Sequence, residues 1–163
     1  DKDPVTYDNV ARAIAAFERT LVTRDRLDAF LHGRDSALTA AEQKGLATFL
    51  TIGCTTCHQG PLLGGGSFQK LGLVEPFPGI ADKGRFEVTK EEEDLHKFKV
   101  PTLRNIAVTG PYLHNGSVKT LNEMVRHMAR HQLGLTLSAE QERDLVTFLN
   151  CLTGEGITAT ARN

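Results

Sequence analysis

The run TIGCTTCHQG, residues 51–60, contains two cysteines separated by two residues, with a histidine directly after the second. Thiols at the spacing of Cys54 and Cys57 can form thioether bonds to the two vinyl groups of a haem. His58 then falls beneath the iron as its proximal ligand. The motif therefore predicts one covalently attached haem c.

Two other chemistries use paired cysteines, and both suit this sequence less well. A thioredoxin-like redox pair is expected between a strand and a helix, a setting that is absent around Cys54. A zinc site needs two further ligands, and no second cysteine pair is present to supply them. Histidines could do so instead, namely His96, His114, His127 and His131. Haem remains the preferred interpretation.

The sixth ligand of such an iron decides its chemistry. A thioether favours reduced iron and raises the reduction potential, whereas an open position or a second imidazole favours ligand binding or a lower potential. The chain has two methionines, Met124 and Met128, four positions apart and so on one face of a helix. Either could bind iron or simply fill a gap in the core, and His127 and His131 are the alternative ligands.

Length and composition indicate one domain. The 163 residues are 40% hydrophobic and carry 19 basic and 20 acidic side chains, so neither a nucleic-acid partner nor membrane insertion is expected. Residues 1–36 are interpreted as a lead-in with a long helix, 37–154 as the haem-binding core and 155–163 as a tail. The amino-terminal residues lack the pattern of a secretory signal.

Helix-start signals mark the elements that must position these residues. Apolar residues recur at spacings of three and four over residues 6–31, which predicts a long amphipathic helix. If this helix is interrupted, the break is expected near Thr23–Asp25. Three further helices are predicted by pairs with the spacing of capping boxes: Thr39 with Glu42, Thr120 with Glu123, and Ser138 with Gln141. The first of these helices would end near Thr51 and deliver Cys54 just beyond its last turn.

Residues 59–117 are rich in glycine and proline and show no ordinary helical pattern. Such a long irregular stretch is unusual in a compact domain. It is expected if the backbone wraps a haem, with Gly64–Gly66 running close to the ring and the acidic run Glu91–Asp94 facing solvent. The predicted fold class is therefore all-α, a cytochrome c-like haem domain with long irregular haem-wrapping loops.

Most of the chain resembles the carboxy-terminal half of the bacterial di-haem cytochrome c peroxidases. The resemblance is carried by LTAAEQKGLATFLTIGCTTCHQG (38–60), PTLRNIAVTGPYLHNGSVKTLNEMV (101–125) and MARHQLGLTLSAEQERDLVTFLNCLTG (128–154). In that family this half holds a high-potential, electron-accepting haem, and the axial methionine opens an M-x-x-x-Q-L-G stretch. The resemblance therefore selects Met128 over Met124. In related methylamine-utilisation enzymes a tyrosine takes this position.

This resemblance implies an electron-transfer domain. It would accept electrons from a small soluble cytochrome c or copper protein and relay them to a peroxidatic haem that reduces hydrogen peroxide to water. That haem and its catalytic glutamate belong to an amino-terminal domain, and this sequence has a single Cys-x-x-Cys-His motif and no tryptophan. No catalytic residue and little peroxidase activity are therefore expected here. The alternative function is a free-standing monohaem electron carrier.

Further roles follow for individual residues. By resemblance, the carbonyls of Thr109 and Pro111 would contribute to a calcium site shared with the second haem domain, and His114 would lie at the haem edge or between domains. Arg104 is a candidate partner for a haem propionate, because its planar guanidinium can donate two parallel hydrogen bonds to a carboxylate. A surface or interdomain salt bridge is the alternative. Cys151 is expected in the core. A periplasmic location and a homodimer complete the expectations.

Overall fold

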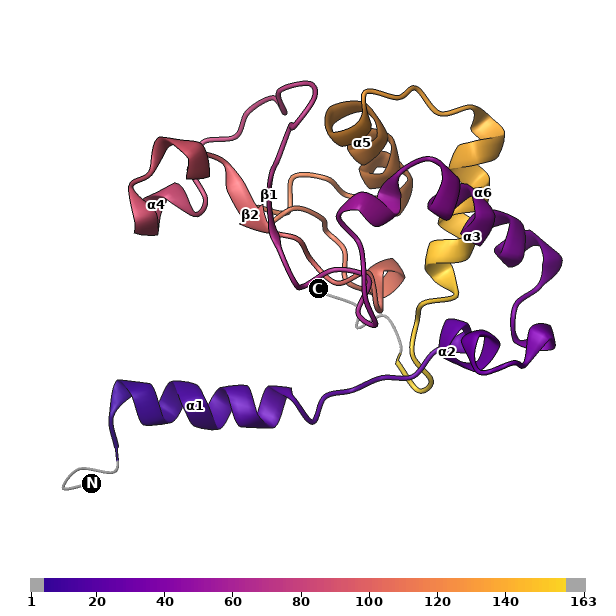
Figure 1. Cartoon of the computed structure of the whole chain (residues 1–163), viewed down its shortest axis with the longest axis horizontal. Helices are drawn as coiled ribbons and strands as arrows, with labels where there is room; N and C mark the ends of the chain where they lie inside the picture. Colours follow the sequence, from indigo (N-terminus) through magenta and orange to yellow (C-terminus); the bar gives the residue numbers. More distant parts are fainter. Residues whose placement is uncertain (1–4, 158–163) are drawn as a thin grey trace.

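The computed structural model describes residues 5–157 and is dominated by helices, which confirms the all-α class (Figure 1). The helices and strands are α1 (Tyr7–Glu18), α2 (Arg26–Leu31), α3 (Ala40–Thr51), β1 (Phe68–Lys70), α4 (Phe86–Thr89), β2 (Lys97–Lys99), α5 (Leu121–Leu133) and α6 (Ala139–Asn150). Within the described residues, no helix is long and apolar enough to cross a bilayer. Residues 158–163 of the expected tail lie outside this part of the chain.

The capping boxes form where the sequence predicted them. At the start of α3, the hydroxyl of Thr39 accepts the N–H of Glu42, and the Glu42 carboxylate accepts the N–H of Thr39 at 2.8 Å. Reciprocal boxes of the same kind begin α5 and α6. These exchanges satisfy backbone donors that a helix start would otherwise leave unpaired. All three helices therefore begin at the predicted residues.

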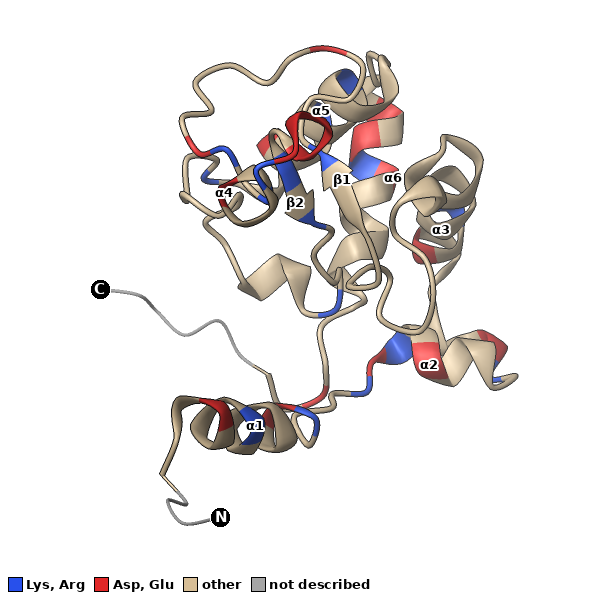
Figure 2. Cartoon of the chain, turned by 60° about the vertical axis from the view of Figure 1, so that its left-hand side comes forward, with Lys and Arg blue, Asp and Glu red and all other residues tan. Residues whose placement is uncertain are grey.

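Two helices occupy the lead-in segment, and the break between them includes Thr23–Asp25, where the sequence allowed one, although it begins earlier than expected. Helix α1 ends at Glu18, and α2 begins at Arg26 after a stretch without helical structure. Asp25 is the N-cap of α2, and its side chain accepts the N–H groups of Leu27 and Asp28. This local bonding gives the backbone an alternative to a helix that continues through residue 25. Helix α1 stands away from α3, α5 and α6 and buries none of its residues (Figures 1 and 2).

The core lies where α3 crosses α6. The rings of Phe49 and Phe148 meet there with centroids 5.2 Å apart, and Leu149 and Leu152 are buried beside them. Cys151 is 1% exposed, which confirms its expected place in the core, and burial raises the pKa of its thiol to about 12. Helix α5 packs on α6 and contributes Val125 to the same cluster.

The long connection between α3 and α5 contains a small antiparallel sheet, with Gln69 of β1 opposite Phe98 of β2. Strands of three residues are too short for alternation to reveal them in a sequence. The charged excursion between the strands includes α4 (Figure 2). Glu91–Glu93 of its acidic run are exposed, as expected. Asp94 is only 5% exposed and pairs with Arg85 and Lys97 at 2.9 and 3.0 Å.

Candidate haem site

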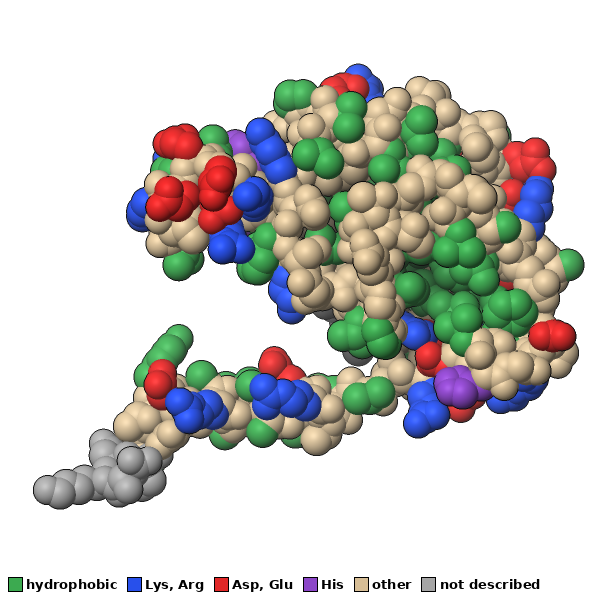
Figure 3. All heavy atoms as spheres, in the orientation of Figure 1, with side chains coloured by type: hydrophobic (Ala, Val, Ile, Leu, Met, Phe, Trp, Pro, Cys, Tyr) green, Lys and Arg blue, Asp and Glu red, His purple; other side chains and the backbone are tan. Residues whose placement is uncertain are grey.

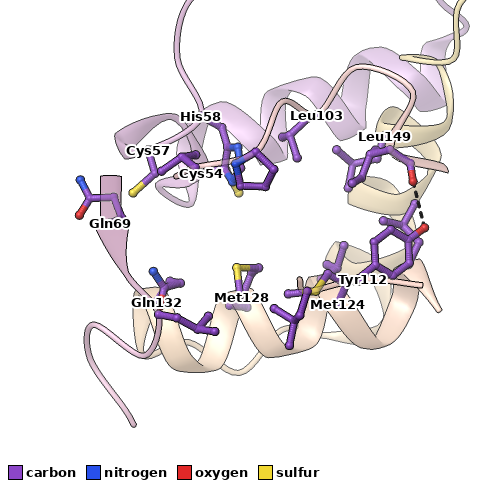
Figure 4. Close-up of a pocket in the computed structure, with 18 of the residues that line it drawn as sticks. Cys54, Cys57, His58, Gln69, Leu103, Tyr112, Met124, Met128, Gln132 and Leu149 are labelled. Atoms are coloured by element: carbon purple, nitrogen blue, oxygen red, sulfur yellow. Dashed lines mark hydrogen bonds between the residues drawn. The ribbon is translucent and has the colours of Figure 1, made fainter. Parts of the chain in front are cut away.

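The residues predicted to hold a haem surround one cavity of about 470 Å³. Cys54, Cys57, His58 and Met128 all line it, on a wall that is otherwise mostly apolar (Figure 4). This volume is typical of pockets that hold a cofactor or a drug-sized ligand. An apolar slot with two thiols at one wall suits a flat hydrophobic macrocycle, so the side chains that are present fit a haem c.

His58 and Met128 lie on opposite sides of this cavity (Figure 4). His58 comes from the segment after α3, and Met128 comes from the middle of α5. Met124 also lines the cavity, one turn earlier on α5 and nearer to Tyr112. The arrangement therefore offers an imidazole and a thioether to the two faces of one planar group.

The orientation of His58 is set by a backbone carbonyl. Its Nδ1 lies 3.0 Å from the oxygen of Leu63, to which it donates when the ring is neutral and protonated at that nitrogen. Burial lowers the pKa of His58, which favours this neutral form and leaves Nε2 able to bind a metal. Ligand histidines are commonly held in this way by a second bond.

Gly64 contacts protein rather than lying along the cavity, which differs from the expectation for the glycines at 64–66. Its φ is +133°, and a Cβ there would overlap the carbonyl of Pro101 and lie 3.3 Å from Nδ1 of His58. None of these glycines lines the cavity. A side chain at residue 64 would therefore displace the loop that orients His58.

The surroundings of the two cysteines do not stabilise thiolates. Burial raises the pKa of Cys54 to about 11 and also raises that of Cys57. A redox pair of the thioredoxin type instead depends on a stabilised thiolate. The zinc alternative also lacks support, because residues 5–157 contain no group of three His, Cys, Asp or Glu side chains placed to hold a metal ion.

Arg104 is placed differently from the propionate role considered for it. Its guanidinium pairs with Asp25 and, at 2.8 Å, with Asp28, and it also donates to the carbonyl of Pro61. It is absent from the cavity lining. The salt-bridge alternative is therefore the one that the structure supports, because the donors of the fork are already used by these partners.

His114, Thr109 and Pro111 are brought to the cavity. The ring of His114 stacks on Phe98 with centroids 4.8 Å apart, and its Nε2 lies 3.0 Å from a carboxylate oxygen of Asp82. His114 therefore borders the cavity, while its role at a haem edge or between domains stays a prediction. For Thr109 and Pro111, a calcium-binding role stays a prediction.

Gln132, the glutamine of the M-x-x-x-Q-L-G stretch, lines the cavity, although no role was expected for it from the sequence. Its Oε1 accepts the N–H groups of Gly72 and Leu73 at 2.6 and 3.1 Å, and its Nε2 donates to Lys70 at 3.0 Å. These bonds fasten α5 to the segment after β1. The sequence could have indicated this position, because Gln132 follows Met128 by one helical turn and both side chains therefore lie on one face of α5.

Comparisons with known proteins agree with this site. Residues 97–133 match the family model described as RoxA-like, cytochrome c-like. The chain is 47% identical over 152 residues to the cytochrome c peroxidase Ccp of Escherichia coli (strain K12), covering 90% of this chain and 33% of that protein. It is 44% identical over 157 residues to the cytochrome c551 peroxidase of Pseudomonas aeruginosa, covering 93% and 45%.

A solved structure supports the fold independently. A MauG-like protein associated with microbial copper homeostasis superimposes with a TM-score of 0.75 at 29% identity, covering 93% of this chain and 58% of that one. The chain spans a third to nearly half of the two peroxidases that it matches. Since the identity extends over almost all of its own length, the chain belongs to the bacterial cytochrome c peroxidase family.

Proposed function

We propose that this chain is the high-potential electron-transfer haem domain of a di-haem cytochrome c peroxidase. The observation that carries the proposal is the position of His58 and Met128 on opposite sides of an apolar cavity that both cysteines border. The cavity and its ligand set suit one haem. Peroxide chemistry would take place on a second haem domain.

In this proposal, Cys54 and Cys57 would form the thioether bonds to the haem, and His58 and Met128 would bind its iron. The haem supplies one-electron redox chemistry when bound. The residues of the chain fix its orientation, exclude water through the apolar lining and favour the reduced state through the thioether. A high potential suits a domain that first receives an electron from a soluble donor.

Peroxide cleavage needs an open iron position and a nearby group that moves a proton between the two oxygens. With His58 and Met128 both holding the iron, this chain would leave no position on it open to peroxide. We therefore assign electron transfer to this domain and catalysis to the second haem domain. The isolated chain would exchange electrons readily and turn over peroxide poorly.

The surface proposed to meet the second haem domain includes the apolar side of α1. Figure 3 shows hydrophobic side chains along this helix, and several of them are about half or more exposed: Val10, Ile14, Phe17 and Leu21. The turn at residues 109–112 would complete the surface and provide calcium ligands from the carbonyls of Thr109 and Pro111. The electron donor would be a small cytochrome c or copper protein, the location the periplasm, and a homodimer a compatible assembly.

The test compares the 163-residue chain with the same chain joined to a second haem domain of a peroxidase. Steady-state peroxidase assays with reduced cytochrome c should give a far lower rate for the isolated chain, although stopped-flow reduction shows that it accepts electrons. Equal peroxidase rates would contradict the proposal. So would an absorption spectrum of the isolated chain that lacks a six-coordinate haem.

A further inference from the structure

We propose that Arg104 is a positioning residue that influences the reduction potential of the haem by holding the carbonyl of Pro61, at the start of the short loop whose Leu63 carbonyl accepts from His58. The inference rests on the proposed function, because it requires His58 to bind the haem iron. In place of the propionate role considered for Arg104, it assigns this residue an action on His58 through the protein backbone.

The guanidinium of Arg104 lies at the centre of a buried ionic cluster. Its side chain is 11% exposed, that of Asp25 is 0% exposed, and that of Asp28 is 27% exposed. Asp25 and Asp28 are also the two members of the capping box that begins α2. Arg104 is therefore fixed on one side by two carboxylates that are themselves held by the backbone.

On its other side, the same guanidinium holds one carbonyl with two hydrogen bonds. Nε and Nη2 of Arg104 donate to the oxygen of Pro61 at 3.0 and 2.8 Å. Two donors from a rigid planar fork define both the distance and the direction of their acceptor. Pro61 therefore has a position that is set by the ionic cluster.

The short loop that starts at Pro61 needs this support. Leu63 has a φ of 50°, in the left-handed region that costs a branched side chain free energy. Thr102 donates through its hydroxyl to the carbonyl of Leu62 at 2.6 Å, and the N–H of Leu103 lies 3.3 Å from the carbonyl oxygens of Leu62 and Leu63. Arg104 is the only one of these donors that also connects the loop to α2.

The carbonyl of Leu63 lies 3.0 Å from Nδ1 of His58 and is its principal acceptor, with a second backbone contact from Pro101. A short bond at Nδ1 makes an imidazole a stronger electron donor to its metal, which favours oxidised iron and lowers the potential. If the loop relaxes, this bond lengthens, donation to the iron falls and the potential rises. Arg104 would in this way oppose the effect of the Met128 thioether and limit how high the potential becomes.

The experiment uses the haem-loaded chain and a variant that removes the two most buried charges of the cluster, leaving only the partly exposed carboxylate of Asp28. The double substitution Arg104→Gln with Asp25→Asn removes both charges, and asparagine can still cap α2. The matched control is Arg26→Gln with Glu42→Gln, which removes the neighbouring ion pair of α2 while glutamine can still form the capping box at Thr39. Arg26 and Glu42 bond to each other and, through Glu42, to Thr39, rather than to the Pro61–Leu63 loop.

Spectroelectrochemical titration is expected to show a rise in the equilibrium constant for reduction of about twofold to tenfold in the Arg104 variant, the range that a weakened hydrogen bond supplies. The NMR signal of the His58 Nδ1 proton should shift in the same variant. The control should match the parent protein in both measurements. A potential that is unchanged, or one that shifts equally in the control, would overturn the inference.

Mass spectrometry and the absorption spectrum separate this inference from the proposed function. A parent chain without covalent haem would overturn both. A normally ligated haem with an unaltered potential in the Arg104 variant would overturn the inference alone. If the double variant does not fold, Arg104→Lys keeps the charge for Asp25 and Asp28 but loses the fork; it should raise the potential, and the absence of a rise would equally overturn the inference.

Discussion

The backbone of Gly45 on α3 lies directly against the carbonyl oxygen of Asp144 on α6. A methyl group at residue 45 would overlap that oxygen and would lie 2.7 Å from Cβ of Phe148. The helices can approach this closely only because residue 45 has no side chain. The contact fixes the middle of α3, the helix that precedes the two cysteines, against α6.

Gly45→Ala should therefore lower the free energy of unfolding by about 1–3 kcal/mol, the usual cost of overpacking a core. This loss would occur although alanine is the better helix former. Denaturant titration of the haem-loaded protein measures it. Gly66→Ala is the matched control, since a Cβ at residue 66 meets no heavy atom within 4 Å. Similar losses in both variants would show that the α3–α6 contact is not the cause.

Replacing the thioether opposite His58 should change the potential without opening the iron. Met128→His should keep six coordination and lower the midpoint potential, because imidazole stabilises oxidised iron better than a thioether does. Redox titration measures this shift. Met124→His, one turn earlier in the same cavity, is the control and should leave the potential close to that of the parent. The reverse pattern would make Met124 the ligand.

Haem attachment should depend on both cysteines of the motif. Cys54→Ala and Cys57→Ala should each remove one thioether bond, and the double variant should lose its haem in a denaturing solvent, because no covalent bond then remains. Mass spectrometry of the intact chain detects the haem directly. Cys151→Ala is the control and should retain the haem mass, since Cys151 lies in the core and does not line the cavity.

Acid should weaken the protein partly through Glu42. Burial acts to raise the pKa of Glu42, but hydrogen bonds from Arg26 and Thr39 outweigh it and hold this pKa below its ordinary value. The resulting stabilisation is fully present above the unfolded pKa of about 4.3 and is lost as the pH falls through the folded pKa.

Glu42→Gln tests this, because the variant has no carboxylate to titrate. The difference in unfolding free energy between the parent and the variant should be largest near neutral pH and should shrink below about pH 4. Denaturant titrations across this range measure it. A difference that stays constant with pH would mean that the ionised carboxylate contributes nothing beyond its capping bonds.

Local signals were sufficient to predict much of this fold and site. Capping boxes depend on residues three positions apart, so the starts of α3, α5 and α6 could be read from the sequence. The Cys-x-x-Cys-His motif is also contiguous, and the family resemblance selected Met128. These predictions needed no knowledge of which distant segments come together.

The rest depends on contacts between distant segments. Arg104 pairs with Asp25 and Asp28, more than 70 positions away, and nothing in the TLRN run reveals that its partners lie there. Asp94 was expected in solvent because an acidic run usually is, but two cations cover it. The paired strands at Gln69 and Phe98 were missed because their pairing, rather than their composition, defines them.

Helix α1 has twelve residues, none of them buried. A helix of that length is marginal in water without packing partners. Its backbone amides in the isolated chain should therefore exchange with deuterium quickly, and they should become protected when another protein surface covers its apolar side. Hydrogen–deuterium exchange at residues 7–18 would thus report docking of a partner directly, independently of the optical and redox signals of the haem.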